Sequence, residues 1–200
     1  LDSILGTNNY STWDIEQNLP YSKIDIQETL NFFDYIIYYA DGNSQLSKLS
    51  NEILAYVAPP NVNNHILISS IVASDNDDSL YTFLSSDAFN LVESSYRLKP
   101  TGDYRINPGQ VIYSRDSNYV DIQVTPGTIV ANPVGLVPGA DADTLYQLPI
   151  SSRGDWEGEP VIGLKYPKNT SAKLIFLSFT LHSTNGFDNL DEVIREFLEE

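Results

Sequence analysis

The stretch KLIFLSFTLHSTNG, residues 173–186, decides how the fold is interpreted. It reads as a buried strand that stays apolar until it reaches Thr180 and His182, and it breaks at the turn formers Asn185 and Gly186. Open α/β sheets place ligands and catalytic groups just beyond the carboxyl ends of their strands. We therefore expect His182 at such an edge, either as a working part of a site or as the remnant of one.

Two other apolar runs have the length of a strand, residues 34–40 (DYIIYYA) and residues 65–70 (HILISS). Residues 10–15 (YSTWDI) read as a shorter strand, which we expect beside residues 34–40 in the same sheet. Continuous apolar strands that alternate with amphipathic helices are typical of a parallel sheet with both faces covered. The pattern therefore predicts an α/β fold with a mostly parallel, doubly wound sheet.

Helical periodicity supplies the elements that would cover this sheet. Residues 47–57 predict an amphipathic helix, residues 80–84 a shorter one, and residues 1–5 the end of a helix that stops at Gly6. A last helix is expected after Asp188, which is placed to cap it. Its apolar face would contain Leu190, Val193, Ile194, Phe197 and Leu198.

Residues 100–160 have a different character. Prolines and glycines recur at short intervals and separate β-like pieces such as residues 110–114 (QVIYS) and residues 119–124 (YVDIQV). This region is interpreted as a β-rich excursion from the parallel sheet. The segments that follow, residues 160–166 and 173–180, are predicted to pair antiparallel around a short turn.

The composition excludes several classes of function. Twenty-seven acidic residues against 11 basic ones give a net charge of -16, which would repel the phosphates of a nucleic acid. Cysteine is absent, so disulfides, thiolate metal ligands and cysteine nucleophiles are excluded, and methionine is absent as well. No apolar run approaches roughly 18 residues, so no membrane insertion is expected. We expect no cofactor, and a location that is extracellular, at the cell surface or periplasmic.

The order of these pieces resembles a known family. The segments that carry the resemblance are, in order, residues 10–15, FFDYIIYYADGN, a helix into LAYV, HILISS, and the ending KLIFLSFTLHS followed by NLDEVIREFLEE. In this order they are similar to class I glutamine amidotransferase-like, flavodoxin-like domains of multidomain bacterial secreted or surface proteins. The resemblance covers residues 1–92 and 138–200. It implies one α/β domain over residues 1–200 that contacts neighbouring domains of the same polypeptide. Such domains open with a strand ahead of the first helix, so the resemblance also implies a fragment that lacks this strand.

The resemblance also bears on catalysis. Carried over onto this sequence, the family's cysteine falls near Ser70 or Ile71, its histidine on Thr180 and its glutamate on His182. None of these residues is of the required type, so glutamine hydrolysis by the family mechanism is excluded. A fold can persist without its chemistry. The expected function is therefore a catalytically silent structural or ligand-binding module, whose small ligand the sequence does not name.

A hydrolase with a rearranged site is the alternative. Ser70, Asp143 and His182 follow one another in the chain order of the α/β-hydrolase triad, with Ser69 as a second candidate nucleophile. A nucleophile elbow needs small residues around its serine because the turn is strained. The segment ISSIVAS supplies β-branched neighbours instead. We therefore prefer to interpret Ser69, Ser70 and His182 as residues that end strands and bond to backbone.

The acidic loop at Asp75, Asp77 and Asp78 is the one candidate metal site. Calcium favours several oxygen ligands on a flexible loop. The loop lacks the glycine of an EF-hand at its sixth position, and the twelfth position, where a glutamate is required, is Ser86. We therefore interpret it as a solvated loop that caps a helix starting near Ser79, with calcium binding as the alternative.

Two Asn-x-Ser triplets, Asn9-Tyr10-Ser11 and Asn169-Thr170-Ser171, have the form of N-glycosylation acceptors. Such triplets are expected by chance in a chain this rich in Asn and Ser. They matter only in a host that glycosylates its exported proteins.

Overall fold

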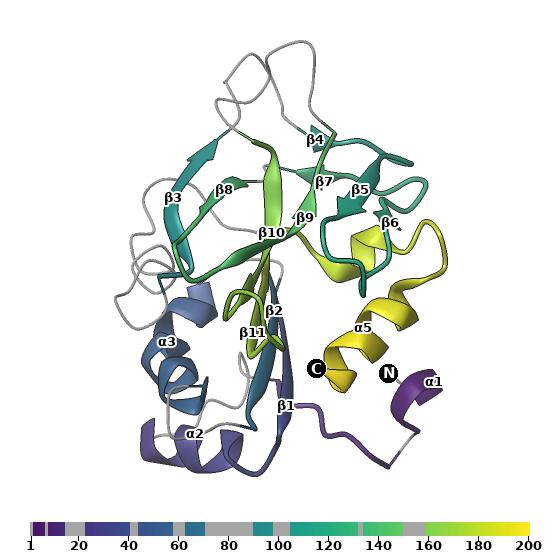
Figure 1. Ribbon diagram of the computed structural model, residues 1–200. Coiled ribbons are helices and arrows are strands. Elements are labelled where there is room, and N and C mark those ends of the chain that lie inside the picture. Colours follow the sequence, from purple (N-terminus) through teal and green to yellow (C-terminus); the bar gives the residue numbers. More distant parts are fainter. Residues whose placement is uncertain are drawn as a thin grey trace.

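The computed structural model describes residues 2–6, 8–14, 23–40, 44–57, 63–70, 90–97, 105–131, 134–149 and 159–200. These residues form a mixed α/β structure around a curled seven-stranded sheet (Figure 1). In sheet order the strands are β1 (Tyr35–Ala40), β2 (His65–Ser70), β11 (Leu174–Leu177), β10 (Val161–Tyr166), β9 (Asp143–Gln147), β5 (Val111–Ser114) and β6 (Ile122–Gln123).

Two smaller sheets and a few helices complete the described structure. The small sheets pair β3 (Val92–Arg97) with β8 (Val134–Pro138) and β4 (Arg105–Ile106) with β7 (Val130–Ala131). The helices are α1 (Asp2–Leu5), α2 (Lys23–Leu30), α3 (Ser44–Val57), the 3-10 helix η1 (Leu181–Thr184) and α5 (Leu190–Glu199). Among the described residues, no helix is long and apolar enough to cross a membrane.

The predicted parallel core is present, but the sheet as a whole is not mostly parallel. β1, β2 and β11 run parallel to one another, as the three apolar runs predicted. β10 pairs antiparallel with β11, which confirms the predicted hairpin, and the pairings of β10 with β9, β9 with β5 and β5 with β6 are antiparallel too. A doubly wound parallel arrangement is therefore not confirmed.

The β-rich region around residues 100–160 explains the difference. The sequence predicts an excursion from the sheet here, whereas β9, β5 and β6 belong to the main sheet itself. The connection from β5 to β6, residues 115–121, is too short for the crossover that a parallel pair requires, so these two strands pair antiparallel. The strands predicted over residues 110–114 and 119–124 are confirmed as β5 and β6, with β6 shorter than expected.

Two apolar clusters pack against opposite faces of the parallel strands. Alternate residues of a strand point to opposite faces, so Ile66 and Ile68 of β2 join one cluster and Leu67 joins the other. α2 and α3 cover the first face, and α5 covers the second (Figure 1). The apolar face predicted for the last helix is confirmed, since Val193, Ile194 and Phe197 are buried.

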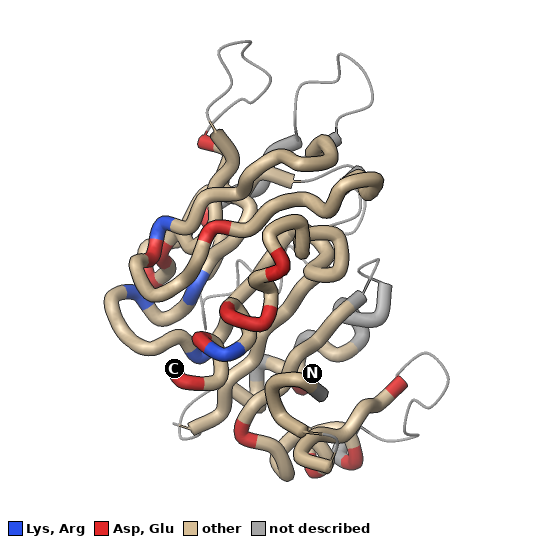
Figure 2. Tube along the Cα trace, turned by 90° about the vertical axis from the view of Figure 1, so that its right-hand side faces the viewer, with Lys and Arg blue, Asp and Glu red and all other residues tan. Residues whose placement is uncertain are grey.

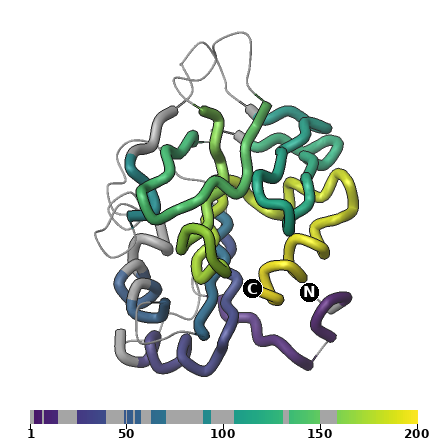
Figure 3. The backbone as a smooth tube through the Cα atoms, viewed as in Figure 1, coloured from purple at the N-terminus to yellow at the C-terminus, as the bar shows by residue number. Residues whose placement is uncertain are grey.

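The strand predicted over residues 10–15 is wrong. Residues 10–14 contain no strand, although Trp13 packs against the cluster that α2 and α3 cover. α1 ends at Leu5 ahead of Gly6, as predicted. α1 lies beside α5, and the Ser3 hydroxyl donates to Asp191 Oδ2 at 3.0 Å (Figure 3).

Two other expectations have different outcomes. Asp188 does not cap α5, because the N-cap residue is Asn189 and the Leu190 N–H donates instead to Asn185 Oδ1 at 3.1 Å. The short helix predicted over residues 80–84 lies outside the described residues.

Acidic positions are spread over several elements in the view of Figure 2, as the composition implies.

Candidate functional site at the carboxyl edge of the parallel strands

The carboxyl ends of β1, β2 and β11 lie side by side at one edge of the sheet. Tyr39 of β1 and Leu177 of β11 both pair with Ser69 of β2, so the three residues form one row. The chain leaves β11 after Leu177 and enters η1, which contains His182. The strand predicted to continue to Thr180 is therefore shorter than expected, and His182 lies on a helical turn beyond it.

Ser69 fastens this turn to the end of β2. Its side chain is fully buried, and its hydroxyl donates to the Phe179 carbonyl at 2.9 Å. The same oxygen accepts a hydrogen bond from the Leu181 N–H at 3.0 Å. The hydroxyl proton and one lone pair of Ser69 are thus both used by backbone groups.

The other hydroxyl groups of the turn are also engaged. Thr180 Oγ1 and Ser183 Oγ are hydrogen-bonded to each other at 2.9 Å, and the Thr184 hydroxyl donates to the Leu181 carbonyl at 2.8 Å. The Ser178 hydroxyl lies 2.9 Å from the Val134 carbonyl and 3.1 Å from that of Ile162. All four side chains are buried, and each has a hydrogen-bond partner within the protein.

A loop after β6 holds the turn from its other side. The Thr125 N–H donates to the Ser183 carbonyl at 2.9 Å, and the Thr125 hydroxyl oxygen accepts from the Asn185 N–H at 3.0 Å. The Thr128 hydroxyl lies 3.3 Å from the same Ser183 carbonyl. η1 is therefore fixed between β2 and this loop, which gives His182 a rigid base.

His182 is exposed and forms a pair with Tyr39. The Tyr39 hydroxyl and His182 Nδ1 are hydrogen-bonded. Their ring centroids lie 5.5 Å apart at an interplanar angle of 74°, an edge-to-face arrangement. Tyr39 is 46% exposed, so both rings are presented to solvent at the edge where α/β sheets bind ligands.

The predicted triad is assembled only in part. Ser70 ends β2 and is buried beside Ser69, and His182 reaches the same edge. Asp143 opens β9, where it pairs with Lys165 and thus lies in the row of Leu67, three strands from β2. At about 4.8 Å per strand Asp143 lies roughly 14 Å from β2, which carries Ser70, so the three residues are not assembled as a triad.

Asp143 has a structural role instead. Its Oδ2 accepts a hydrogen bond from the Asn169 N–H at 2.8 Å, and its Oδ1 lies 3.7 Å from Lys168 Nζ. Both partners belong to the turn between β10 and β11. The carboxylate therefore holds this turn against the start of β9.

The calcium alternative falls on a part of the chain that the structure leaves out. Asp75, Asp77 and Asp78 lie outside the described residues. Across the described ranges, no group of three or more His, Asp or Glu side chains is arranged to hold a metal ion.

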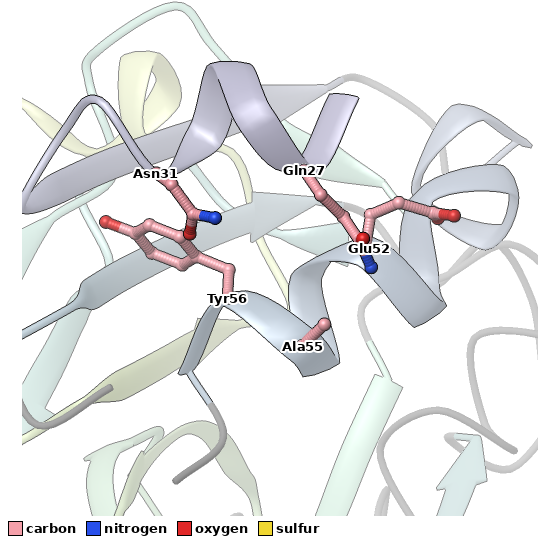
Figure 4. Close-up of a pocket in the computed structure, with 5 residues that line it drawn as sticks. All are labelled: Gln27, Asn31, Glu52, Ala55 and Tyr56. Carbon is pink, nitrogen blue, oxygen red and sulfur yellow. The ribbon is translucent and has the colours of Figure 1, made fainter. Parts of the chain in front are cut away.

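A small pocket lies between α2 and α3. It is lined by Gln27, Asn31, Glu52, Ala55 and Tyr56, with Asn31 and Tyr56 at one end and Gln27 and Glu52 at the other (Figure 4). Its volume is about 100 Å³, well below the roughly 300 Å³ at which pockets for drug-sized ligands begin. This volume corresponds to a few water molecules.

The pocket is far from His182 along the sheet. The Tyr56 hydroxyl donates to the Phe33 carbonyl at 2.7 Å, just before β1 begins, so Tyr56 lies at the amino edge of the strands. Burial, followed by the negative charge of Asp34, raises the pKa of Tyr56. The phenol therefore stays protonated and serves as a hydrogen-bond donor that joins α3 to β1.

A charged pair stabilises the sheet away from this edge. Lys165 Nζ of β10 contacts Asp116 Oδ2 just after β5, and both side chains are largely buried. Burial alone would raise the pKa of Asp116, but the hydrogen bond from Lys165 lowers it below its usual value. The pair therefore links two parts of the antiparallel half of the sheet.

Sequence reasoning located His182 and the two serines but missed Tyr39 and Thr125. Tyr39 reads as one more strand residue in YIIYYA, and its partner is 143 residues away in the sequence. Thr125 lies in a Thr-Pro-Gly segment that signals only a turn. No local pattern could have revealed either contact, because both depend on the packing of distant segments.

Comparisons of the chain with protein-family models, with curated proteins and with solved structures gave no match. The mixed sheet and its carboxyl edge are therefore the basis for assigning a function.

Proposed function

We propose that the chain is a catalytically silent, amidotransferase-like α/β module with a structural or ligand-binding role in a larger extracellular or periplasmic protein. The three parallel strands and the closing helix α5 support the likeness to that class. The absence of cysteine supports the loss of its chemistry. Neighbouring domains of the same polypeptide are the partners that this proposal implies.

The hydrogen bonding of Ser69 is the observation that carries the proposal. A serine nucleophile must pass its proton to a base, which must in turn be oriented by a third group. The Ser69 hydroxyl donates to the Phe179 carbonyl, which is no base, and Asp143 is three strands away. The serine therefore closes the edge of the sheet instead of opening a catalytic site there.

The exposed pair of Tyr39 and His182 supports the ligand-binding form of the proposal. Its rings are held on a rigid turn, so a ligand could be bound with little loss of conformational entropy. This pair is where we place the small ligand. A phenol ring and an imidazole ring offer both stacking and hydrogen bonding.

Hydrolysis assays test the catalytic part of the proposal. We expect the wild-type chain to hydrolyse activated esters and amides no faster than the His182→Ala variant and the Ser70→Ala variant. The variants must first be shown to melt cooperatively, so that a lost activity is not confused with a lost fold. A wild-type rate at least tenfold above both variants would establish the hydrolase alternative.

A chemical-shift titration tests the binding part. Fragments that combine an aromatic ring with a hydrogen-bonding group are added to labelled protein, and the ring signals of His182 are followed. We expect saturable shifts that the Tyr39→Ala variant abolishes, with the exposed Tyr113→Ala variant as a matched control. An absence of saturable shifts at His182 would contradict the ligand-binding form of the proposal.

A further inference from the structure

The turn between β10 and β11 is an exposed projection with a fixed shape. The Lys173 N–H donates to the Tyr166 carbonyl at 2.7 Å and closes the loop at its base. The Lys168 N–H donates to the Asp141 carbonyl at 2.8 Å. Residues 168–171 are all exposed, so this tip projects from a firmly held base.

The triplet Asn169-Thr170-Ser171 forms this tip, and its acceptor amide is available. Asn169 has a φ of 58°, in the left-handed region that Asn tolerates better than most residues. Its backbone N–H donates to Asp143 Oδ2. Within the part of the chain that the structure describes, no hydrogen bond involves its side-chain amide, which lies on an exposed residue.

The second triplet is in a different situation. Asn9 Nδ2 donates to the Leu5 carbonyl at 2.6 Å, four residues earlier, where α1 ends. Its amide therefore satisfies one of the carbonyls that a helix leaves unpaired at its end. A sugar on this nitrogen would replace one of its two protons and crowd the helix end, whereas a sugar on Asn169 would disturb no contact.

We propose that Asn169 is an N-glycosylation site. The inference goes beyond the proposed function and requires the export that it includes. Asn169 Nδ2 attacks the anomeric carbon of a lipid-linked oligosaccharide, supplied with a transferase by the host. A nitrogen–carbon bond forms, the bond from that carbon to the phosphate oxygen breaks, the lipid phosphate leaves, and the amide proton passes to a base of the transferase.

The position of the tip agrees with this proposal. β11 starts at Leu174, which pairs with Ile66 near the start of β2, so the tip lies at the amino edge of the parallel strands. Tyr39 and His182 lie at the carboxyl edge. A glycan on Asn169 would therefore leave the candidate binding surface uncovered and add solubility at the opposite edge.

Secretion of the chain from yeast tests the proposal, with peptide mass spectrometry before and after enzymatic removal of N-glycans. We expect a glycan on Asn169 and none on Asn9. The Asn169→Gly and Ser171→Ala variants should be secreted without the glycan, whereas Ser171→Thr should keep it. Glycine is chosen because it accepts the positive φ at this position.

Two results would overturn the proposal. One is a secreted wild-type chain whose Asn169 peptide carries no sugar. The other is an unchanged glycan mass in the Asn169→Gly variant. The Asn9→Gly variant is the matched control, and it should retain the full glycan mass of the wild type. A glycan found on Asn9 would contradict the structural distinction between the two triplets.

Discussion

At the scale of single residues, the carboxyl edge of the sheet contrasts two kinds of polar group. Ser69 is buried and bonds to two backbone groups, whereas Tyr39 and His182 are exposed and bond to each other. Leaving a buried backbone group unpaired costs far more than losing a bond at the surface. Replacing Ser69 should therefore lower the free energy of unfolding. Replacing Tyr39 or His182 should leave stability nearly unchanged and alter only ligand binding at the surface.

Replacement of Ser69 by alanine tests this contrast. Ser69→Ala leaves the buried Leu181 N–H without its acceptor, so we expect a loss of about 1–3 kcal/mol in the free energy of unfolding. Urea denaturation measures it. Tyr39→Phe and the exposed Ser117→Ala should each change stability by less than about 0.5 kcal/mol. Equal losses in Ser69→Ala and Ser117→Ala would show that the turn is not fastened through Ser69.

Gly139 gives a second prediction at this scale. A Cβ at Gly139 would lie 1.6 Å from the Asn90 carbonyl oxygen, so the two backbone segments would have to separate. We expect Gly139→Ala to destabilise the fold by about 3 kcal/mol or more, measured by thermal denaturation. Gly109→Ala is the control, because it has a φ of 77° but no atom within 4 Å, and should cost only about 1–2 kcal/mol. A smaller loss at Gly139 than at Gly109 would contradict the close packing.

At the scale of elements, β10 joins the parallel core to the antiparallel half of the sheet. It pairs with β11 on one side and β9 on the other, and its Lys165 reaches Asp116 beyond β5. The lowered pKa of Asp116 means that its carboxylate is more stable in the folded than in the unfolded chain. Its contribution is fully present above the unfolded pKa and is lost as the pH falls through the folded pKa.

The pH dependence of stability tests this link. Asp116→Asn should lower the free energy of unfolding at pH 7 by about 1.5–3 kcal/mol, the usual range for hydrogen bonds to charged groups. The difference from wild type should shrink as the pH falls below the unfolded pKa of aspartate, about 3.9. Denaturant titrations from neutral to acidic pH measure it, and the exposed Asp188→Asn is a control. A difference that stays constant with pH would rule out the ion pair as its cause.

The elements also show how far the sequence determines the fold. The apolar runs at residues 34–40 and 65–70 predicted β1 and β2, and β2, which is buried along its whole length, shows most clearly why such a run is continuously apolar. The sequence did not reveal that β9 and β5 join the same sheet, since strand pairing depends on distant partners. Trp13 illustrates the limit of local pattern: its segment reads as a strand, yet residues 10–14 contain none and Trp13 packs against the core.

The candidate site was predictable to a similar extent. His182 was expected at the carboxyl edge because of its place after an apolar strand, and it lies at that edge. The 3-10 turn that carries it was not expected. Within it the Thr184 hydroxyl donates to the Leu181 carbonyl, and the Leu181 N–H donates to the Ser69 hydroxyl of β2, so side chains take the place of ladder partners where the strand stops.

At the scale of the whole molecule, the dominant property is the net charge of -16. Acidic groups are spread over several elements, so they repel one another in the compact state. Salt shortens the range of this repulsion, from about 30 Å at 0.01 M to about 8 Å at 0.15 M. The folded state benefits more than the unfolded chain, in which the charges are further apart.

The melting temperature should therefore rise with ionic strength. We expect an increase of a few degrees between about 0.01 M and 0.15 M sodium chloride, since roughly 1 kcal/mol corresponds to 2–4 °C for a chain of this size. Differential scanning calorimetry at constant pH measures it. A melting temperature that falls with added salt would mean that attractive ion pairs outweigh the repulsion.

Structural hydrogen bonds close the carboxyl edge at Ser69, and we propose that this edge performs no serine chemistry. A fluorophosphonate probe followed by intact-mass spectrometry tests it most directly, because an activated serine forms a stable adduct. We predict that the wild-type chain gains no adduct mass under conditions that fully label a known serine hydrolase. Labelling of Ser69 or Ser70 in the wild type that disappears in the folded His182→Ala variant would contradict the account.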